Sequence, residues 1–312
     1  MRLFKTIVFF IVCFLSSTKE NLCAQYATNV IVTDIANVTL SKNMEQEASK
    51  LLTVFNDAYY KDTQPDLQNV KDKVKISAIW GISPLKCIET EIIVRGYTTK
   101  FGYQIRNIPM FLKDVTEEDA ERDIVINFDM NGIITDIYFC INVGGFLEEA
   151  NEVTELKRRL ELIDFLEKFF AAYYFKDIKA VSDKFSYDDQ IISGRVTKVT
   201  GEDGIVNEET TFTHQTKEEY INKLKEIFAN NKTIDMKFEA IELQQHPKYN
   251  HIYGVTFSQV WNTTNYRDIV FVFLYIDFRD ENNPLIKRVL PSIEQINRQS
   301  LNAAQILDQI FN

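Results

Sequence analysis

The feature that most constrains the fold is a long amphipathic segment inside Ala150–Val196, which a shorter helical segment and a polar strand follow. Aromatic residues crowd its end, from Phe165 to Phe175. This bulk exceeds what the seam of a helical bundle requires, so it predicts a helix that lies across a concave sheet. The apolar residues recur at spacings of three and four, which aligns them on one helical face: Val153, Leu156, Leu160, Ile163, Leu166, Phe170 and Tyr173.

The first residues show the pattern of a secretory signal peptide. Arg2 and Lys5 give a positive start, Ile7–Leu15 is apolar, and a polar region then leads to Cys23-Ala24-Gln25. The apolar run is too short to span a membrane, and no later stretch reaches the roughly 18 residues that a spanning helix needs. We therefore expect a secreted or periplasmic protein with no transmembrane segment.

Composition and charge limit the classes of partner. The chain has 312 residues, of which 45% are hydrophobic and 26% charged, an ordinary globular composition that allows two medium domains. Without residues 1–25 it keeps 32 basic and 44 acidic residues, a net charge of about −12. A strongly negative chain argues against nucleic acid and anionic membranes as partners.

Two cysteines, Cys87 and Cys140, remain after the leader. In an oxidising compartment they could form one disulfide, although a single bridge is no disulfide scaffold. Two buried thiols on neighbouring strands are an equally good reading.

The first half reads as helices followed by antiparallel strands. Ser41 is a plausible N-cap for a helix that ends near Lys61-Asp62, and Asp129–Gly132 is a hairpin turn because Asn-Gly tolerates positive φ. We leave Tyr26–Thr39 unassigned. A short helix is expected at Leu67–Val74, and the period-two pattern that follows predicts strands: Lys75–Trp80, Cys87–Tyr97, Tyr103–Leu112, Asp123–Phe128 and Ile133–Val143.

The second half repeats this order with additions. A capping box, Thr216–Glu219, opens an extra helix. We expect Asp268–Phe278 to be a central strand and Leu285–Leu290 an edge strand. The other expected elements are a helix at Asp177–Phe185, strands at Gln190–Val199, Ile234–Ala240 and Tyr253–Trp261, a turn at Gly201–Gly204 and a terminal helix within Ser292–Asn312.

A weak internal repeat supports two tandem domains. Ala58-Tyr59-Tyr60 and Ala172-Tyr173-Tyr174 each end a predicted helix, and Arg122–Val125 and Arg267–Val270 each open a strong strand. We expect an α+β fold with two cone-like domains, each with N-terminal helices on a curved antiparallel sheet. The expected divisions are a leader at 26–40, domains at 41–145 and 146–291, and a C-terminal segment at 292–312.

This order of elements resembles the nuclear transport factor 2-like (NTF2-like, SnoaL-like) superfamily, the cone-shaped fold of ketosteroid isomerase and the polyketide cyclases. Phe165–Val196 and the late strands His251–Trp261 and Arg267–Phe278 carry the resemblance. More narrowly, the chain resembles secreted tandem-domain proteins of Bacteroidota. The resemblance implies a ligand pocket in the open end of the cone, between the long helix and the sheet. It does not choose between enzymes and binding modules.

The resemblance also suggests weak catalytic candidates. Asp188 or Asp189 could act as a general base, and a buried tyrosine, Tyr173 or Tyr253, could polarise a carbonyl. The competing interpretation of the two aspartates is a solvated turn. Arg195 and His214 could bind an acidic ligand, although isolated polar residues on strands are usually only exposed.

The remaining site candidates are apolar. Trp261 and Tyr253 could line a ligand pocket, and Trp261 ends its strand beside polar residues, so we expect it at a rim. We find no metal-ligand spacing around His214, His246 or His251, no phosphate-binding glycine loop and no nucleophile elbow. We therefore expect no metal and no cofactor.

Three functional hypotheses follow. The first is a non-catalytic binding or interaction module with an unknown small molecule or protein partner. The second is a small-molecule isomerase or cyclase. The third is an assembly protein, including a homo-oligomer, that docks through its sheet face. An enzyme needs a buried carboxylate with a raised pKa, whereas an assembly module needs a wide apolar patch on the outer sheet face.

Overall fold

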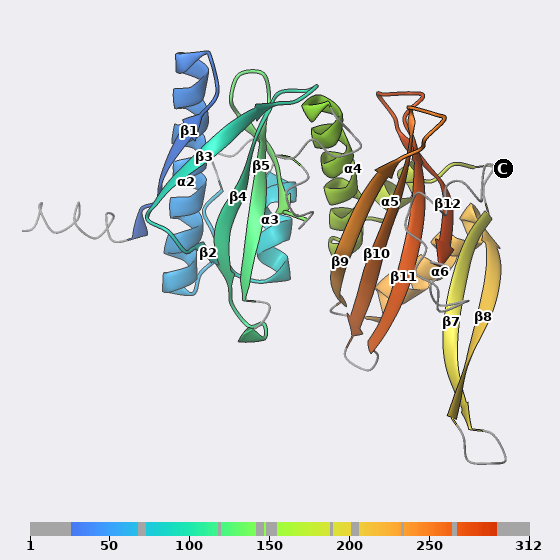
Figure 1. Ribbon diagram of the computed structural model, residues 1–312. Coiled ribbons are helices and arrows are strands. Elements are labelled where there is room, and N and C mark those ends of the chain that lie inside the picture. The colour runs from blue at the N-terminus through green and yellow to red at the C-terminus, as the bar shows by residue number, and fades with distance from the viewer. Residues whose placement is uncertain are drawn as a thin grey trace, which may run out of the picture. The chain divides into compact units, whose positions relative to one another are not determined.

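The computed structural model describes residues 26–67, 73–117, 120–141, 147, 155–187, 190–200, 206–231, 234–263 and 267–291. The chain forms two compact units, Met1–Cys140 and Ile141–Asn312 (Figure 1). Four expected features lie outside the described residues: the signal segment, the Asp188-Asp189 pair, the Gly201–Gly204 turn and the terminal helix after position 291. Most of a fifth, the short helix expected at Leu67–Val74, lies outside them as well.

Where the structure describes it, the first unit places two helices against a six-stranded sheet. The strand order is β1-β3-β4-β5-β6, with β2 also paired to β4. Only the β1–β3 pair is parallel among these described strands. The elements are β1 (Asn29–Thr33), α2 (Val38–Lys61), α3 (Lys73–Ile82), β2 (Leu85–Cys87), β3 (Glu91–Thr98), β4 (Tyr103–Leu112), β5 (Glu121–Phe128) and β6 (Ile134–Phe139).

The core of this unit lies between α2, α3 and one face of the sheet. The buried side chains of α2 recur at helical spacing, and α2 packs on β1 and β2 while α3 packs on β6. Phe55 and Trp80 join the two helices, with ring centroids 5.6 Å apart. Trp80 therefore serves packing.

Two expectations for the first unit are wrong. Lys75–Trp80 is not a strand but part of helix α3, in which Ile76, Ile79 and Trp80 are buried. The N-cap of α2 is Asn37, whose side chain accepts a bond from the Leu40 N–H at 3.2 Å, and not Ser41. Ser41 is a helical residue that donates its hydroxyl to the Val32 carbonyl at 3.0 Å. In sequence alone, a serine whose hydroxyl bonds to the carbonyl of a neighbouring strand cannot be distinguished from a serine that caps a helix N-terminus.

The predicted hairpin between β5 and β6 is confirmed. The Asp129 carboxylate accepts the N–H groups of Asn131 and Ile133 at 2.9 and 3.0 Å. Gly132 has a φ of +80°, which a residue with a Cβ adopts only at a cost. The turn therefore depends on both the Asx bond and the glycine.

In its described residues, the second unit places three helices against a six-stranded curved sheet. The strand order is β8-β7-β12-β11-β10-β9, and the β12–β7 pair is parallel. The elements are α4 (Leu156–Tyr174), α5 (Ile178–Lys184), β7 (Gln190–Thr200), β8 (Val206–Thr216), α6 (Lys217–Asn230), β9 (Ile234–Gln245), β10 (Ile252–Thr263), β11 (Arg267–Asp277) and β12 (Leu285–Pro291). With helices on a mixed, mainly antiparallel sheet in each unit, the α+β class is confirmed.

One strand of this unit lies elsewhere than expected. β12 was expected at an edge, but it lies between β11 and β7 inside the sheet. Its contact with β7 runs through the Val289–Ile191 pair, which connects the β7–β8 hairpin to the rest of the sheet. β11 lies inside the sheet as predicted.

The aromatic end of α4 packs on the sheet as its sequence predicts. Phe170 stacks on Phe238 of β9 at 3.6 Å and meets Phe257 of β10 edge-on at 5.2 Å. The strands bend here, because the β9–β10 register shifts between Thr256 and Ser258. A bulge increases local twist and bending, so it gives the sheet the concave face that receives these rings.

The capping box of α6 is confirmed. The Thr216 hydroxyl accepts the Glu219 N–H at 3.2 Å, and the Glu219 carboxylate accepts the Thr216 N–H at 2.8 Å. Both bonds satisfy N–H groups that a helix start leaves without partners. This cap fixes where α6 begins, directly after β8, and so which face of α6 lies over the sheet.

Candidate functional site

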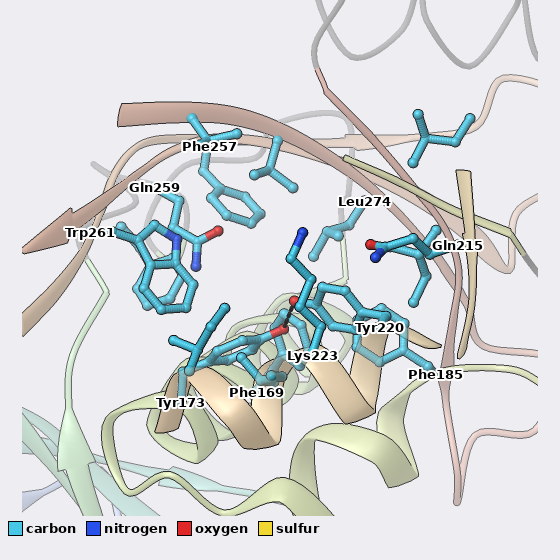
Figure 2. A pocket seen from close by; sticks show the side chains of 17 residues that line it. Phe169, Tyr173, Phe185, Gln215, Tyr220, Lys223, Phe257, Gln259, Trp261 and Leu274 are labelled. Atoms are coloured by element: carbon cyan, nitrogen blue, oxygen red, sulfur yellow. Dashed lines mark hydrogen bonds between the residues drawn. The ribbon is translucent and has the colours of Figure 1, made fainter. Parts of the chain in front are cut away.

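The second unit contains a cavity of about 180 Å³ between α4, α6 and the concave face of the sheet (Figure 2). Its described walls come from α4 and α6, from the end of α5, and from strands β7 to β11. This is the place that the family resemblance implies for a ligand. The cavity is therefore the candidate site.

Aromatic and aliphatic side chains form most of its wall. Phe169, Phe185 and Phe257 are buried, and their rings lie around the cavity with Trp261 and Leu274 (Figure 2). Alternation along β10 and β11 aims every second side chain at the cavity. Such a lining favours apolar ligands, because burying their surface releases water from both partners.

Two tyrosine hydroxyls form the polar floor. Tyr173 from α4 and Tyr220 from α6 place their hydroxyl oxygens 2.8 Å apart. Burial, the nearby Tyr220 and the hydrogen bond between them raise the pKa of Tyr173 well above its usual range. Burial also raises the pKa of Tyr220. Both groups are neutral phenols at neutral pH, and the pair can present one O–H to a ligand oxygen.

Three longer polar side chains complete the lining. Figure 2 shows Gln215 of β8, Gln259 of β10 and Lys223 of α6 reaching toward the open space between α6 and the sheet. The Gln259 amide donates to the Met236 sulfur at 3.3 Å, a weak acceptor that leaves the amide available to a better one. Lys223 supplies the one formal charge among the described lining residues.

The structure brings together two of the predicted site residues. Tyr173 and Trp261 both line the cavity, with ring centroids 6.4 Å apart. Tyr253 is not among the described lining residues, and its hydroxyl donates to the Asn250 carbonyl at 2.9 Å in the β9–β10 turn. It therefore stabilises this turn and lies apart from the described lining of the cavity.

The polar site candidates are either absent from the described lining of this cavity or lie outside the residues that the structure describes. The Asp188-Asp189 pair lies outside the described residues. Arg195 pairs with Thr211 in the β7–β8 hairpin, and His214 is exposed on β8 opposite Ile192. No carboxylate lies among the lining residues that the structure describes.

The cysteine, metal and membrane expectations concern the rest of the chain. Cys87 is buried and Cys140 half-buried, and no disulfide joins them in the structure. Burial raises the pKa of the Cys87 thiol. Within the described ranges, no cluster of three or more His, Cys, Asp or Glu side chains could hold a metal ion. No helix in that part of the chain is long and apolar enough to cross a membrane.

Sequence reasoning missed Gln215, Tyr220, Lys223 and the role of Gln259. For Gln259 a signal existed, because it alternates with Phe257 and Trp261 on one face of β10. Lys223 and Tyr220 are one helical turn apart on α6, but only the packing of α6 shows that this face meets the cavity.

Comparisons with known proteins give similarity to solved structures only. Neither a protein-family model nor a curated protein sequence matches this chain. The Bdellovibrio bacteriovorus protein Bd1075 is 14% identical, with a TM-score of 0.34, over 51% of this chain and 46% of its own. Pgp2, a helical cell shape determining protein of Campylobacter jejuni, is 14% identical, with a TM-score of 0.30, over 42% of this chain and 41% of its own.

A third structure is a putative ketosteroid isomerase from Shewanella frigidimarina. It is 14% identical, with a TM-score of 0.29, over 41% of this chain and 92% of its own length. The chain thus spans less than half of the first two structures and nearly all of the third. The structural neighbours include NTF2-like proteins at low identity.

Proposed function

We propose that the second unit is a non-catalytic binding module of NTF2-like fold, whose cavity takes a small and largely apolar ligand. The observation that carries this proposal is the cavity itself. Protein cores are close-packed, whereas this partly open cavity of about 180 Å³ keeps an apolar wall and a few polar groups accessible, as ligand pockets do.

Its size limits the ligand. A void of ~150 Å³ lined by apolar groups holds one benzene ring. A cavity of about 180 Å³ therefore fits one ring with a short substituent. A steroid or a polyketide intermediate would require the wall to open.

The alternative is an isomerase or cyclase, and the Tyr173–Tyr220 pair favours it. A buried phenol that donates to a substrate carbonyl is a known way to stabilise a developing oxyanion. Proton abstraction also needs a base, for which Asp188 and Asp189 remain the candidates. Slow exchange of the α-proton of a bound ligand with deuterated water, catalysed by the protein, would favour this alternative.

Ligand binding can be tested by fluorescence, because the chain has two tryptophans, one in each unit. In a Trp80→Phe background the remaining Trp261 reports on the cavity wall. We expect benzyl alcohol, a neutral probe of the right size, to change this emission saturably. A linear drift that never saturates would contradict the proposal.

A filled cavity gives the matched control. Val270 lines the cavity directly opposite Gln259, whereas the adjacent residue, Ile269, is exposed and points to the other face of the sheet. Val270→Phe should abolish binding, and Ile269→Phe should leave it unchanged. Equal effects of the two substitutions would refute the cavity as the site.

We further propose that the mature protein is exported to the periplasm or the exterior, on the basis of Arg2, Lys5 and the apolar run Ile7–Leu15. The mass of the mature chain tests this, because cleavage near Gln25 should remove the leader. The intact mass would overturn it. A protein partner or a second copy at the sheet face stays a hypothesis that the same purified chain tests by its size in solution.

A further inference from the structure

We infer that the ligand of this cavity is a monocarboxylate, whose apolar body lies in the aromatic wall and whose carboxylate meets the Lys223 amine at the mouth. This inference rests on the proposed binding function. It adds the chemical class of the ligand, which apolar walls alone do not specify.

The position of Lys223 is the first argument. Tyr220, Lys223, Leu224 and Ile227 all line the cavity from α6. Lys223 is exposed while Leu224 is buried, so the lysine stands at the edge of the apolar region. Figure 2 shows its side chain extending toward the space that Gln215 and Gln259 also face. A cation placed there contacts solvent and ligand together.

The availability of the amine is the second argument. Lys168 and Lys179 each form an ion pair with an aspartate four residues away, at 2.7 and 2.5 Å. Lys223 has Glu219 at the same spacing, but that carboxylate is held by the backbone and hydroxyl of Thr216 in the capping box. Lys223 forms no ion pair with any described residue, so its charge is available to a ligand.

The balance of charge and volume decides the ligand class. One lysine compensates one negative charge, and the flanking amides of Gln215 and Gln259 can donate to the second oxygen of a carboxylate. A phosphate monoester carries nearly two charges at neutral pH and leaves less of the cavity for an apolar body. Because the amine is at the mouth, the carboxylate stays partly hydrated, which avoids the cost of burying an ion.

The test compares two probes of nearly equal size, benzoate and benzyl alcohol, at neutral pH. In the Trp80→Phe background, we expect benzoate to bind about five- to tenfold more tightly, as a charge-assisted bond at a partly exposed site allows. Lys223→Met should remove this preference without weakening benzyl alcohol. Lys225→Met is the control, because Lys225 is on the same helix and is not among the described lining residues.

The outcomes separate the inference from the function on which it rests. Equal binding of both probes, or a benzoate preference that survives Lys223→Met, overturns the carboxylate inference and leaves the binding function intact. If neither probe binds, both fail. A preference that Lys225→Met removes equally well would indicate general charge attraction, and it would also overturn the role of Lys223. Raising the salt concentration should reduce the preference for benzoate, since the ion pair between the Lys223 amine and the benzoate carboxylate is near solvent.

Discussion

Replacing Phe170 by alanine should strongly destabilise the second unit. The Phe170 side chain is 2% exposed, stacks on Phe238 at 3.6 Å with planes 7° apart, and meets Phe257 edge-on. Truncation of a buried phenylalanine costs about 3 to 5 kcal/mol, and aromatic pairs add to the loss. We expect a loss of about 4 kcal/mol in the free energy of unfolding. With a urea dependence of about 2 kcal/mol per M, the unfolding midpoint should fall by about 2 M.

The assay is equilibrium unfolding in urea, followed by Trp261 emission in the Trp80→Phe background, so that the signal reports on the second unit alone. Tyr187→Ala is the control, because the Tyr187 side chain is 88% exposed and its ring lies over the Lys217 amine, 3.9 Å from the ring centroid. Its midpoint should shift by less than about 0.5 M, since exposed cation–π contacts are worth about 0.5–1 kcal/mol. Similar shifts for the two variants would refute the packing of α4 on the concave sheet.

Three further substitutions test separate features. Because the pKa of Tyr173 is raised in the folded state, the unfolded state loses this proton at a lower pH than the folded state does. The free energy of unfolding should therefore fall as the pH rises above about 10, the usual pKa of tyrosine. Tyr173→Phe should lessen that fall in a series of urea unfolding midpoints measured at increasing pH. Gly102→Ala should disrupt the first unit, because the added Cβ would lie 1.9 Å from the Phe128 carbonyl oxygen. Gly81→Ala is the control, since its Cβ would meet nothing within 4 Å, and it should leave the first unit folded. Trp80 emission measures both effects. Thr216→Ala should cost the second unit about 1 kcal/mol in urea unfolding through loss of the helix cap.

Local patterns in the sequence predicted the elements that local interactions determine. The capping box at Thr216, the Asp129–Gly132 turn and the amphipathic face of α4 each depend on residues within a few positions of one another. In the region of Lys73–Ile82, however, the same residues fit both periods, and packing against the sheet selects the helix.

Pairings between distant residues were beyond such reasoning. β1 pairs with β3, and Asn29 lies opposite Glu91. β12 enters the sheet because it pairs with β7, far away in the chain, whereas we expected it at an edge. The residues of the candidate site likewise fall into those that local sequence predicts and those that only long-range packing brings together. Tyr173 and Trp261 could be predicted from aromatic content, whereas Lys223 joins the site only because α6 packs over the sheet.

The most direct test of the central claim is a nuclear Overhauser measurement on the ¹³C-labelled chain with unlabelled benzyl alcohol. If the cavity is the binding site, intermolecular cross-peaks should connect the ligand ring to Leu274 and Phe257 on the sheet face and to Tyr173 on the opposing helix α4. Cross-peaks confined to other residues, or none at saturating ligand, would show that the cavity is not a ligand site and would contradict the proposed function.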